Sequence, residues 1–250
     1  MVLIFGGTTE GRLVTAKMDA VGLTYVYSTK SKINFVPGLG CIYIHGTMNA
    51  EDLNAFCREN EIQLIINAAH PFATELHSNI SLAGEKSGIS IIRFERIFPE
   101  RIIHPLITYC SNYCEAIQVL LSLNIYRLLA FTGVQSIEKL QSYWKDNVTF
   151  FRILPRDESK QIAIQAGFPI ENLIFDMPES TIEKECELIQ HLNIQGIITK
   201  ESGTTGFQEI KIHAALNLNI PVVIIKRPNL PDNFINLTTM ESLLQQVISF

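Results

Sequence analysis

The sequence is poor in the features that mark membrane, secreted and nucleic-acid-binding proteins. No apolar run approaches the roughly 18 residues that a membrane-spanning helix needs. The five cysteines in the 250-residue chain are odd in number and scattered, so they do not form a disulfide framework. Charged residues make up only 18%, the net charge is −5, and there is no long basic stretch. This balance argues against general binding to nucleic acid.

The chain also lacks a complete metal-binding pattern. Cys110 and Cys114 are four residues apart, a spacing that fits packing on one helix better than metal ligation. His70 and His77 share a helical face, but no carboxylate pattern completes a zinc site around them. We therefore expect no bound metal.

A signal-peptide pattern is missing as well, because the chain begins directly with an apolar strand-like run. Together with the cysteine usage this predicts a soluble protein of a reducing compartment, the cytoplasm. Hydrophobic residues make up 47%, which is ample for a buried core. The length allows one large domain or two small ones.

The first dozen residues carry the strongest functional signal. Residues 2–5 predict a buried parallel strand, which runs into Gly6 and Gly7 and then into an amphipathic helix that Thr8 or Thr9 would cap. A strand, a glycine turn and a helix N-terminus together form an arrangement that binds phosphate. The predicted cofactor-binding residues of this loop are Gly6, Gly7, Thr8, Thr9, Glu10 and Gly11.

The loop matches known phosphate-binding motifs only in part. Gly6, Thr8 and Gly11 fall on the three glycine positions of the dinucleotide-binding fingerprint, with threonine in the middle. Arg12 and Leu13 stand where a nucleoside-triphosphate loop needs lysine and then serine or threonine, which argues against that class. The alternative is an ordinary turn between strand and helix that binds no ligand.

Beyond this loop, short apolar runs alternate with amphipathic stretches, a pattern typical of α/β folds. The predicted strands are 2–5, 23–27, 41–45, 64–68, 89–93, 106–109, 127–131, 149–153, 173–175, 196–199 and 222–225. The predicted helices after the first are 50–59, 71–87, 114–123, 137–144, 158–166, 182–191 and 208–218.

This order predicts an α/β protein with two Rossmann-like domains, each an open parallel sheet flanked by helices, and a ligand cleft between them. We place the cofactor-binding domain at residues 1–100 and the domain that lines the substrate cleft at 101–250. The tail from residue 232 holds one amphipathic helix, which would pack on its own domain or on a partner subunit.

The end of the second strand bears on the choice of cofactor. An NAD site places an acidic residue there, whereas this chain has Ser28, Thr29, Lys30 and Lys32. Hydroxyls and lysines suit an additional phosphate, so the sequence favours NADPH over NADH. The alternative is a solvated loop without a ligand.

Further polar residues follow other strands, where ligands of such sheets bind. His70 lies after the fourth strand, as a candidate proton donor or a helix cap. In the second half, Thr132 and Gly133 follow one strand, and residues 199–206 (TKESGTTG) follow another. The latter loop, with its lysine and glycines, is typical of an anion site.

Several of these segments together resemble the precorrin-6A reductase family. They are residues 5–12 (FGGTTEGR), 69–73 (AHPFA), 93–96 (RFER), Thr132–Gly133, 199–203 (TKESG) and 220–228 (IPVVIIKRP). The resemblance spans residues 2–228 with the segments in the family's order. Residues 46–53 (GTMNAEDL) are closer to the anaerobic, cobalt-using branch.

The resemblance implies NADPH-dependent reduction of precorrin-6A, or of its cobalt form, to the 6B form in cobalamin biosynthesis, by hydride transfer to a ring double bond. It places the cofactor between two Rossmann-like domains. The residues that it assigns to the substrate are Arg93, Arg96, Thr132, Gly133, Lys200, Ser202 and Gly203.

The implied substrate is a flat tetrapyrrole rimmed by carboxylates, so an acidic protein would need basic residues gathered at its site. Arg93, Arg96, Arg152, Arg156 and Lys200 are the candidates. Two other functions stay open: a nucleotide-dependent dehydrogenase of small molecules, and a non-enzymatic NADPH-binding sensor. We expect a monomer or a small homo-oligomer.

Overall fold

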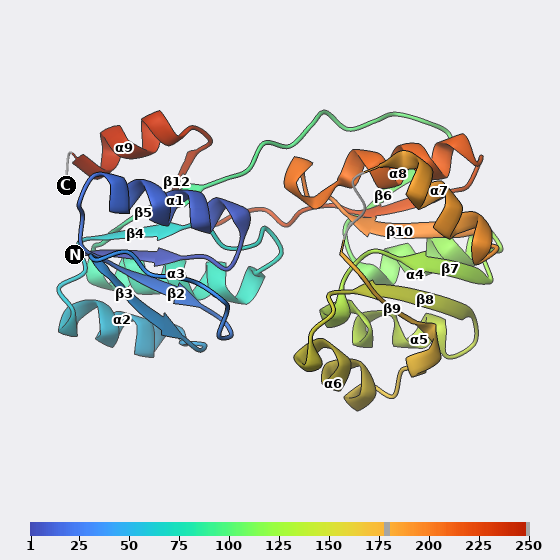
Figure 1. The fold of residues 1–250 in the computed structure, drawn as a ribbon, viewed down its shortest axis with the longest axis horizontal. Helices are drawn as coiled ribbons and strands as arrows, with labels where there is room; N and C mark the ends of the chain where they lie inside the picture. Colours follow the sequence, from blue (N-terminus) through green and yellow to red (C-terminus); the bar gives the residue numbers. More distant parts are fainter. Residues whose placement is uncertain (178–180, 249–250) are drawn as a thin grey trace. The chain divides into compact units, whose positions relative to one another are not determined.

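A computed structural model describes residues 1–177 and 181–248. The chain forms two compact units (Figure 1). Unit 1 comprises Met1–Ile97 together with Pro228–Phe250, and unit 2 comprises Phe98–Arg227. No helix in the described part of the chain is long and apolar enough to cross a membrane.

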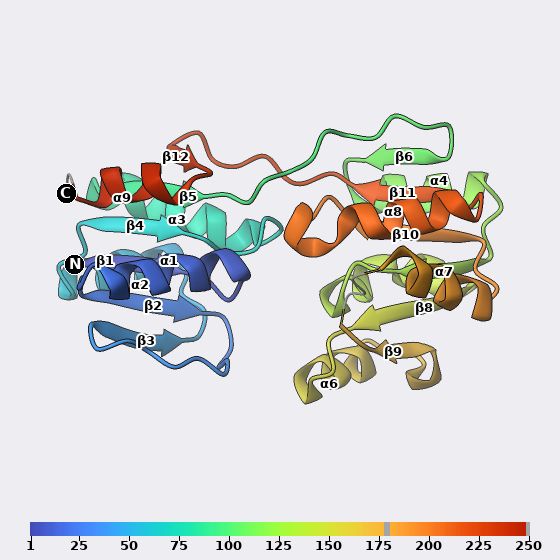
Figure 2. The same cartoon turned by 45° about the horizontal axis from the view of Figure 1, so that its top comes forward.

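Unit 1 is a six-stranded sheet in which every neighbouring pair is parallel. Its strands are β1 (Val2–Phe5), β2 (Tyr25–Thr29), β3 (Cys41–His45), β4 (Leu64–Asn67), β5 (Ser90–Phe94) and β12 (Phe234–Leu237). Its helices are α1 (Thr9–Ala20), α2 (Ala50–Glu59), α3 (Thr74–Ser87) and α9 (Met240–Ile248). The strand order is β12-β5-β4-β1-β2-β3, as Figure 2 shows.

Unit 2 is built in the same way, with a second parallel sheet in the order β6-β11-β10-β7-β8-β9. Its strands are β6 (Ile107–Cys110), β7 (Arg127–Ala130), β8 (Val148–Ile153), β9 (Leu173–Phe175), β10 (Gly196–Lys200) and β11 (Val222–Ile225). Its α-helices are α4 (Tyr113–Ser122), α5 (Gln141–Trp144), α6 (Asp157–Gln165), α7 (Ile182–His191) and α8 (Gln208–Asn217). Short 3₁₀ turns are η1 (Val134–Ser136), η2 (Glu138–Leu140), η3 (Ile170–Asn172) and η4 (Thr204–Gly206).

The two units share one strand order. Strands β3-β2-β1-β4-β5 correspond in sequence order and position to β9-β8-β7-β10-β11. Each sheet has a switch point, β1/β4 in unit 1 and β7/β10 in unit 2, where successive connections leave in opposite directions. Ligands of open α/β sheets bind beyond the carboxyl ends of the strands at such points.

Successive residues of β1 point to opposite faces of the sheet, and both faces are buried. Leu3 packs with side chains of α2 and α3, whereas Ile4 packs with Val14 of α1 and Leu243 of α9. Burial on both faces explains why the strands read as continuous apolar runs rather than as alternating ones. The predicted fold class, two parallel α/β sheets flanked by helices, is confirmed.

The tail of the chain differs from the prediction. Residues 228–250 group with unit 1 rather than with the second domain, because β12 pairs in parallel with β5. Strand β12 is not among the strands predicted from the sequence. Helix α9 packs through Leu243 and Val247 on the sheet of unit 1. The expected division at residue 100 thus omits from the first domain a C-terminal segment that belongs to unit 1.

Two predicted helices also differ from the structure. Helix α3 begins at Thr74 rather than at Pro71, because residues 70–73 form a turn in which the Ala73 N–H donates to the His70 carbonyl. The expected helix 137–144 consists of the 3₁₀ turn η2 and the short helix α5.

The packing of α9 can be tested by truncating one side chain. Leu243 is 0% exposed, so Leu243→Ala should lower the free energy of unfolding by about 2–5 kcal/mol. Leu13→Ala on α1, where the leucine is 55% exposed, is the matched control and should cost less than about 1 kcal/mol. Urea unfolding followed by circular dichroism measures both, and equal losses would contradict the placement of α9.

Candidate active site

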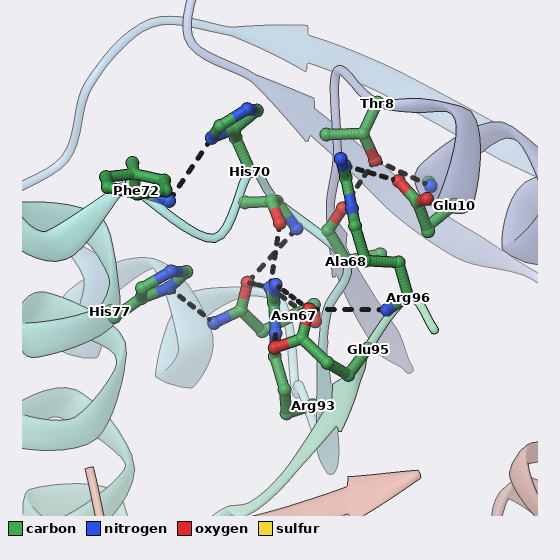
Figure 3. Close-up of polar contacts among 12 residues, drawn as sticks. Thr8, Glu10, Asn67, Ala68, His70, Phe72, His77, Arg93, Glu95 and Arg96 are labelled. Atoms are coloured by element: carbon green, nitrogen blue, oxygen red, sulfur yellow. Dashed lines mark hydrogen bonds and ion pairs between the residues drawn. The ribbon is translucent and has the colours of Figure 1, made fainter. Parts of the chain in front are cut away.

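The turn after β1 joins two neighbouring strands. Thr8 is the N-cap of α1, where its hydroxyl oxygen accepts from the Gly11 N–H at 3.0 Å and its O–H donates to the Ala68 carbonyl at 2.7 Å. The prediction of a threonine cap is confirmed. Because Ala68 directly follows β4, these bonds join the ends of β1 and β4 at the switch point. Figure 3 shows Thr8 above Ala68.

The glycines of this turn are required either by backbone conformation or by close packing. Gly7 has a φ of +87°, and its N–H donates to the Tyr27 hydroxyl at 2.9 Å. A Cβ at Gly6 would overlap the Tyr27 ring, and one at Gly11 would lie 2.8 Å from the Gly6 Cα. The side chain of Thr8, in the middle position, points inward as the N-cap. It therefore does not block the outer side of the turn. These residues fit a dinucleotide pyrophosphate, which binds against such a turn and the first N–H groups of the helix.

The first turn of α1 also carries a buried carboxylate. Glu10 pairs with Arg96 at 2.8 Å, and both side chains are buried. Desolvation lowers the pKa of Arg96, and the carboxylate of Glu10 opposes this shift. A bare carboxylate here would repel a phosphate group, so Arg96 offsets a negative charge at the candidate phosphate site. Thr9 is exposed beside it.

Arg93 is the most enclosed cation of this region, at 1% exposure. Its guanidinium donates to the side chain and backbone of Asn67, to the Ala69 carbonyl, and to both carboxylate oxygens of Glu95. Figure 3 shows these contacts converging on the loop that follows β4. Arg93 therefore fixes that loop from within unit 1.

The network continues from Asn67 to His77 of α3. The Asn67 oxygen accepts from Arg93 and from the Ala69 N–H, so its Nδ2 is the donor to His77 Nδ1, at 2.9 Å. The neutral ring therefore carries its proton on Nε2. Burial, and next the charge of Arg93, lower the pKa of His77 to about 4.

His70 lies on the loop after β4 and is exposed. Its Nδ1 accepts from the Phe72 N–H at 3.2 Å. In the neutral ring the proton is therefore on Nε2. Figure 3 shows the His70 ring turned away from the Asn67–His77 pair.

The end of β2 separates buried from accessible groups. Ser28 and Thr29 are buried, and the Thr29 hydroxyl is engaged with the Tyr43 hydroxyl and the Ser31 carbonyl. Lys30 is exposed. Arg12, which is not among the predicted cofactor-binding residues, reaches from α1 to the Asn34 carbonyl at 3.3 Å, beyond the end of this strand.

In unit 2, the turn after β7 carries a pair of bonded hydroxyls. Gly133 has a φ of +77°, and the Ser136 hydroxyl lies 2.6 Å from the Thr132 hydroxyl and from the Gly133 carbonyl. Lys200 ends the neighbouring strand β10. Burial, and next the charge of Lys139, lower the pKa of Lys200 to about 8.

The loop after Lys200 is held by side chains that the sequence did not single out. The Gly203 N–H, expected to face an anion, donates instead to Gln208 Oε1 at 3.1 Å. Ser202 is buried. Lys211 donates to the Gly206 carbonyl at 2.7 Å, and burial lowers its pKa to about 8.

Glu201 of the same loop ties together the two ends of unit 2. Both of its oxygens accept from Arg101, at 2.8 and 3.0 Å, and one also accepts from the Arg227 N–H at 2.9 Å. Arg152, expected to serve a substrate, forms a buried two-point ion pair with Glu185. These pairs could not be read from the sequence, because their members lie 26 to 100 residues apart.

A sequence profile of the family described as "Precorrin-6x reductase CbiJ/CobK" matches residues 1–248. The chain belongs to this family. It is therefore an oxidoreductase of cobalamin biosynthesis, and the predicted family and type of reaction are confirmed.

Individual relatives agree with this assignment. The chain is 28% identical over 238 residues to a cobalt-precorrin-6A reductase of Synechocystis sp., covering 91% of this chain and 88% of that protein. It is 29% identical over 237 residues to a precorrin-6A reductase of Rhodococcus erythropolis, covering 92% and 90%. A solved structure, "CobK precorrin-6A reductase", has a TM-score of 0.81 at 21% identity, over 99% of this chain and 96% of that one, and so shares the fold.

Within residues 1–177 and 181–248 of this reductase, no cluster of three or more His, Cys, Asp or Glu residues could hold a metal ion.

His77 makes the stability of the reductase depend on pH in a defined direction. Its ordinary pKa of 6.5 falls to about 4 in the fold, so the unfolded chain binds more protons between these values. The free energy of unfolding has its full value above pH 6.5. It decreases as the pH falls towards 4, by on the order of 3 kcal/mol in all.

Urea unfolding between pH 7.5 and 4.5 should therefore show a steeper loss for the wild type than for His77→Gln, which lacks this titration. Histidine NMR provides the direct check, and a midpoint near 6.5 for His77 would contradict the buried neutral ring.

Proposed function

We propose that this reductase uses NADPH to reduce cobalt-precorrin-6A to cobalt-precorrin-6B. The observation that carries the proposal is the family match from residue 1 to 248, which includes the capped glycine turn at the β1/β4 switch point. The cobalt relative from Synechocystis sp. and the resemblance of residues 46–53 to the cobalt-using branch favour the metal-loaded substrate.

The cofactor is assigned to unit 1. The pyrophosphate binds against Gly6, Gly7 and the first turn of α1, with Arg96 balancing the charge of Glu10. NADPH bound there supplies the hydride for the ring double bond. The protein's own contribution is to position the two molecules and to keep water away from the reacting atoms.

The 2′-phosphate of NADPH is assigned to the end of β2. Thr29 and Ser28 are buried, so they shape this edge rather than reach a ligand, whereas Lys30 and Arg12 present positive charge beside it. No acidic residue occupies positions 28–32, where an NAD site would place one.

His70 is the proposed proton donor. The side chain is exposed at the switch point of unit 1, and histidine is the side chain best suited to exchange a proton near neutral pH. Arg93 and Arg96, predicted from the resemblance to contact substrate, have carboxylate partners within unit 1. We assign them a positioning role at the loops after β4 and β1.

The substrate-binding residues of unit 2 are Thr132, Gly133, Lys200, Ser202 and Gly203. The carboxylates of the tetrapyrrole require cations, and Lys200 remains mostly protonated at pH 7 with a pKa of about 8. We assign the enzyme to the cytoplasm, as a monomer or a small homo-oligomer.

The function is tested by anaerobic assays in which cobalt-precorrin-6A and precorrin-6A are compared side by side, each with NADPH and with NADH. The expected result is nicotinamide oxidation with formation of the 6B product, fastest for the cobalt form with NADPH. NADPH binding without turnover of either tetrapyrrole would instead support a sensor, and turnover of simple carbonyl compounds would support a small-molecule dehydrogenase.

Arg12→Gln tests the 2′-phosphate assignment. We expect the Kd for NADPH to rise about tenfold, because a charge-assisted contact is lost, and the Kd for NADH to change less than twofold. Arg58→Gln, which removes an exposed arginine of α2, is the control. Calorimetry measures the Kd of the wild type and of both variants for each cofactor, and an NADPH preference that survives in Arg12→Gln would exclude Arg12 as its source.

A further inference from the structure

The hydroxyls of two tyrosines in unit 1 bond to the two loops assigned to the cofactor. Tyr27 lies on β2, and Tyr43 is its direct partner in the parallel register with β3. Figure 2 shows β1, β2 and β3 side by side in this sheet. Neither tyrosine is among the residues predicted from the sequence to bind the cofactor, so their contacts are information that only the structure provides.

The Tyr27 hydroxyl lies beneath the glycine turn that follows β1. It accepts a hydrogen bond from the Gly7 N–H at 2.9 Å, and Gly7 is the residue of this turn with a φ of +87°. Tyr27 is 0% exposed, and its ring fits against Gly6 only because glycine has no Cβ. A rigidly packed side chain therefore holds the turn in one conformation before a ligand arrives, which lowers the cost of binding.

The Tyr43 hydroxyl holds the loop that follows β2. It accepts from the Ile33 N–H at 3.0 Å and lies 2.8 Å from the Thr29 hydroxyl. Because the Thr29 hydroxyl donates to the Ser31 carbonyl at 2.8 Å, the O–H of Tyr43 is the donor to the Thr29 oxygen. One hydroxyl of β3 thus fixes the beginning and the middle of residues 29–33.

The rings of the two tyrosines belong to one aromatic cluster with Phe35. The centre of the Phe35 ring lies 4.7 Å from that of Tyr27 and 5.5 Å from that of Tyr43, and the tyrosine rings are 6.0 Å apart. These spacings are typical of favourable contacts between aromatic rings. Phe35 thereby packs the loop after β2 against the sheet, next to the Asn34 carbonyl that Arg12 reaches.

We propose that Tyr27 and Tyr43 are positioning residues of the cofactor site that act on different parts of the cofactor. Tyr27 fixes the turn that binds the pyrophosphate, a group that NADPH and NADH share. Tyr43 fixes the loop that meets the 2′-phosphate together with Arg12 and Lys30, a group that NADPH alone carries. This assignment rests on the proposed function.

Calorimetric titration of the full chain with NADPH and with NADH separates the two roles. Tyr27→Phe keeps the ring and removes the acceptor of the Gly7 N–H, so the Kd should rise by about fivefold for both cofactors. In Tyr43→Phe the Kd for NADPH should rise by about fivefold, whereas the Kd for NADH should change by less than about twofold.

Tyr25→Phe is the matched control for both variants. Tyr25 lies on the same strand and face as Tyr27 and is also 0% exposed, but its hydroxyl donates to Asp19 of α1 at 2.8 Å. This variant should lose stability in urea unfolding, as Tyr27→Phe does, while its Kd for each cofactor matches the wild type. A positioning role changes the Kd, whereas a purely structural role changes stability alone.

Two results would overturn the proposal. A Kd for NADPH within about twofold of the wild type in Tyr27→Phe and in Tyr43→Phe would exclude a positioning role for either hydroxyl. Equal losses of NADPH and NADH affinity in Tyr43→Phe would exclude a separate action on the 2′-phosphate.

Hydrogen exchange of the Gly7 amide, followed by NMR, is a readout that needs no cofactor. Exchange should be at least about fivefold faster in Tyr27→Phe than in the wild type and in Tyr25→Phe. Unchanged exchange would overturn the role of Tyr27 even in an active reductase. Conversely, the expected Kd pattern in a protein that binds NADPH but turns over neither tetrapyrrole would support both positioning residues and would count against the proposed function.

Discussion

Burial of each parallel sheet on both faces is the constraint on which the rest of the structure depends. The strands are apolar on both sides, so helices must cover both faces, and the connections must leave the sheet in two directions. In unit 1, α2 and α3 cover one face and α1 and α9 the other. The point where the direction changes, between β1 and β4, is where Thr8 bridges two loops and where His70 lies.

The same constraint explains the return of the chain to unit 1. Without β12 and α9, the edge of β5 and the apolar face beside Ile92 and Phe94 would be exposed. The return also brings two segments, around Arg101 and Arg227, to the ends of unit 2. Glu201 holds both. Because Glu201 lies beside Lys200 and Ser202, the loop assigned to the substrate is anchored to both ends of its unit.

Much of the fold could be predicted because it depends on local pattern. The apolar runs locate the strands, with β1, β3, β9 and β11 at their observed bounds. By contrast, β12 is a short strand with a central exposed pair, Ile235 and Asn236, so neither an apolar run nor regular alternation marks it.

The candidate site was predictable only where its residues are neighbours in sequence. The glycine turn and the Thr8 cap lie within a few residues of each other. Glycine and threonine are the residue types that a tight turn and a helix N-cap prefer, so the local sequence indicates both. Partners such as Glu10 and Arg96, 86 residues apart, meet only through the strand order. The sequence therefore provided candidate basic residues but could not tell that Arg93, Arg96 and Arg152 have carboxylate partners.

Arginine and lysine have different chemical properties in this reductase. Arg93, Arg96 and Arg152 are buried against carboxylates, where a planar, permanently charged group with several donors satisfies fixed acceptors. Lysine suits a different task, because its pKa responds to burial and to neighbouring charge. With a pKa lowered to about 8, Lys200 is still mainly protonated at neutral pH, and a nearby anion would raise its pKa back towards the ordinary 10.5. The buried arginines thus hold their loops through fixed ion pairs, whereas the charge of a buried lysine responds to its surroundings.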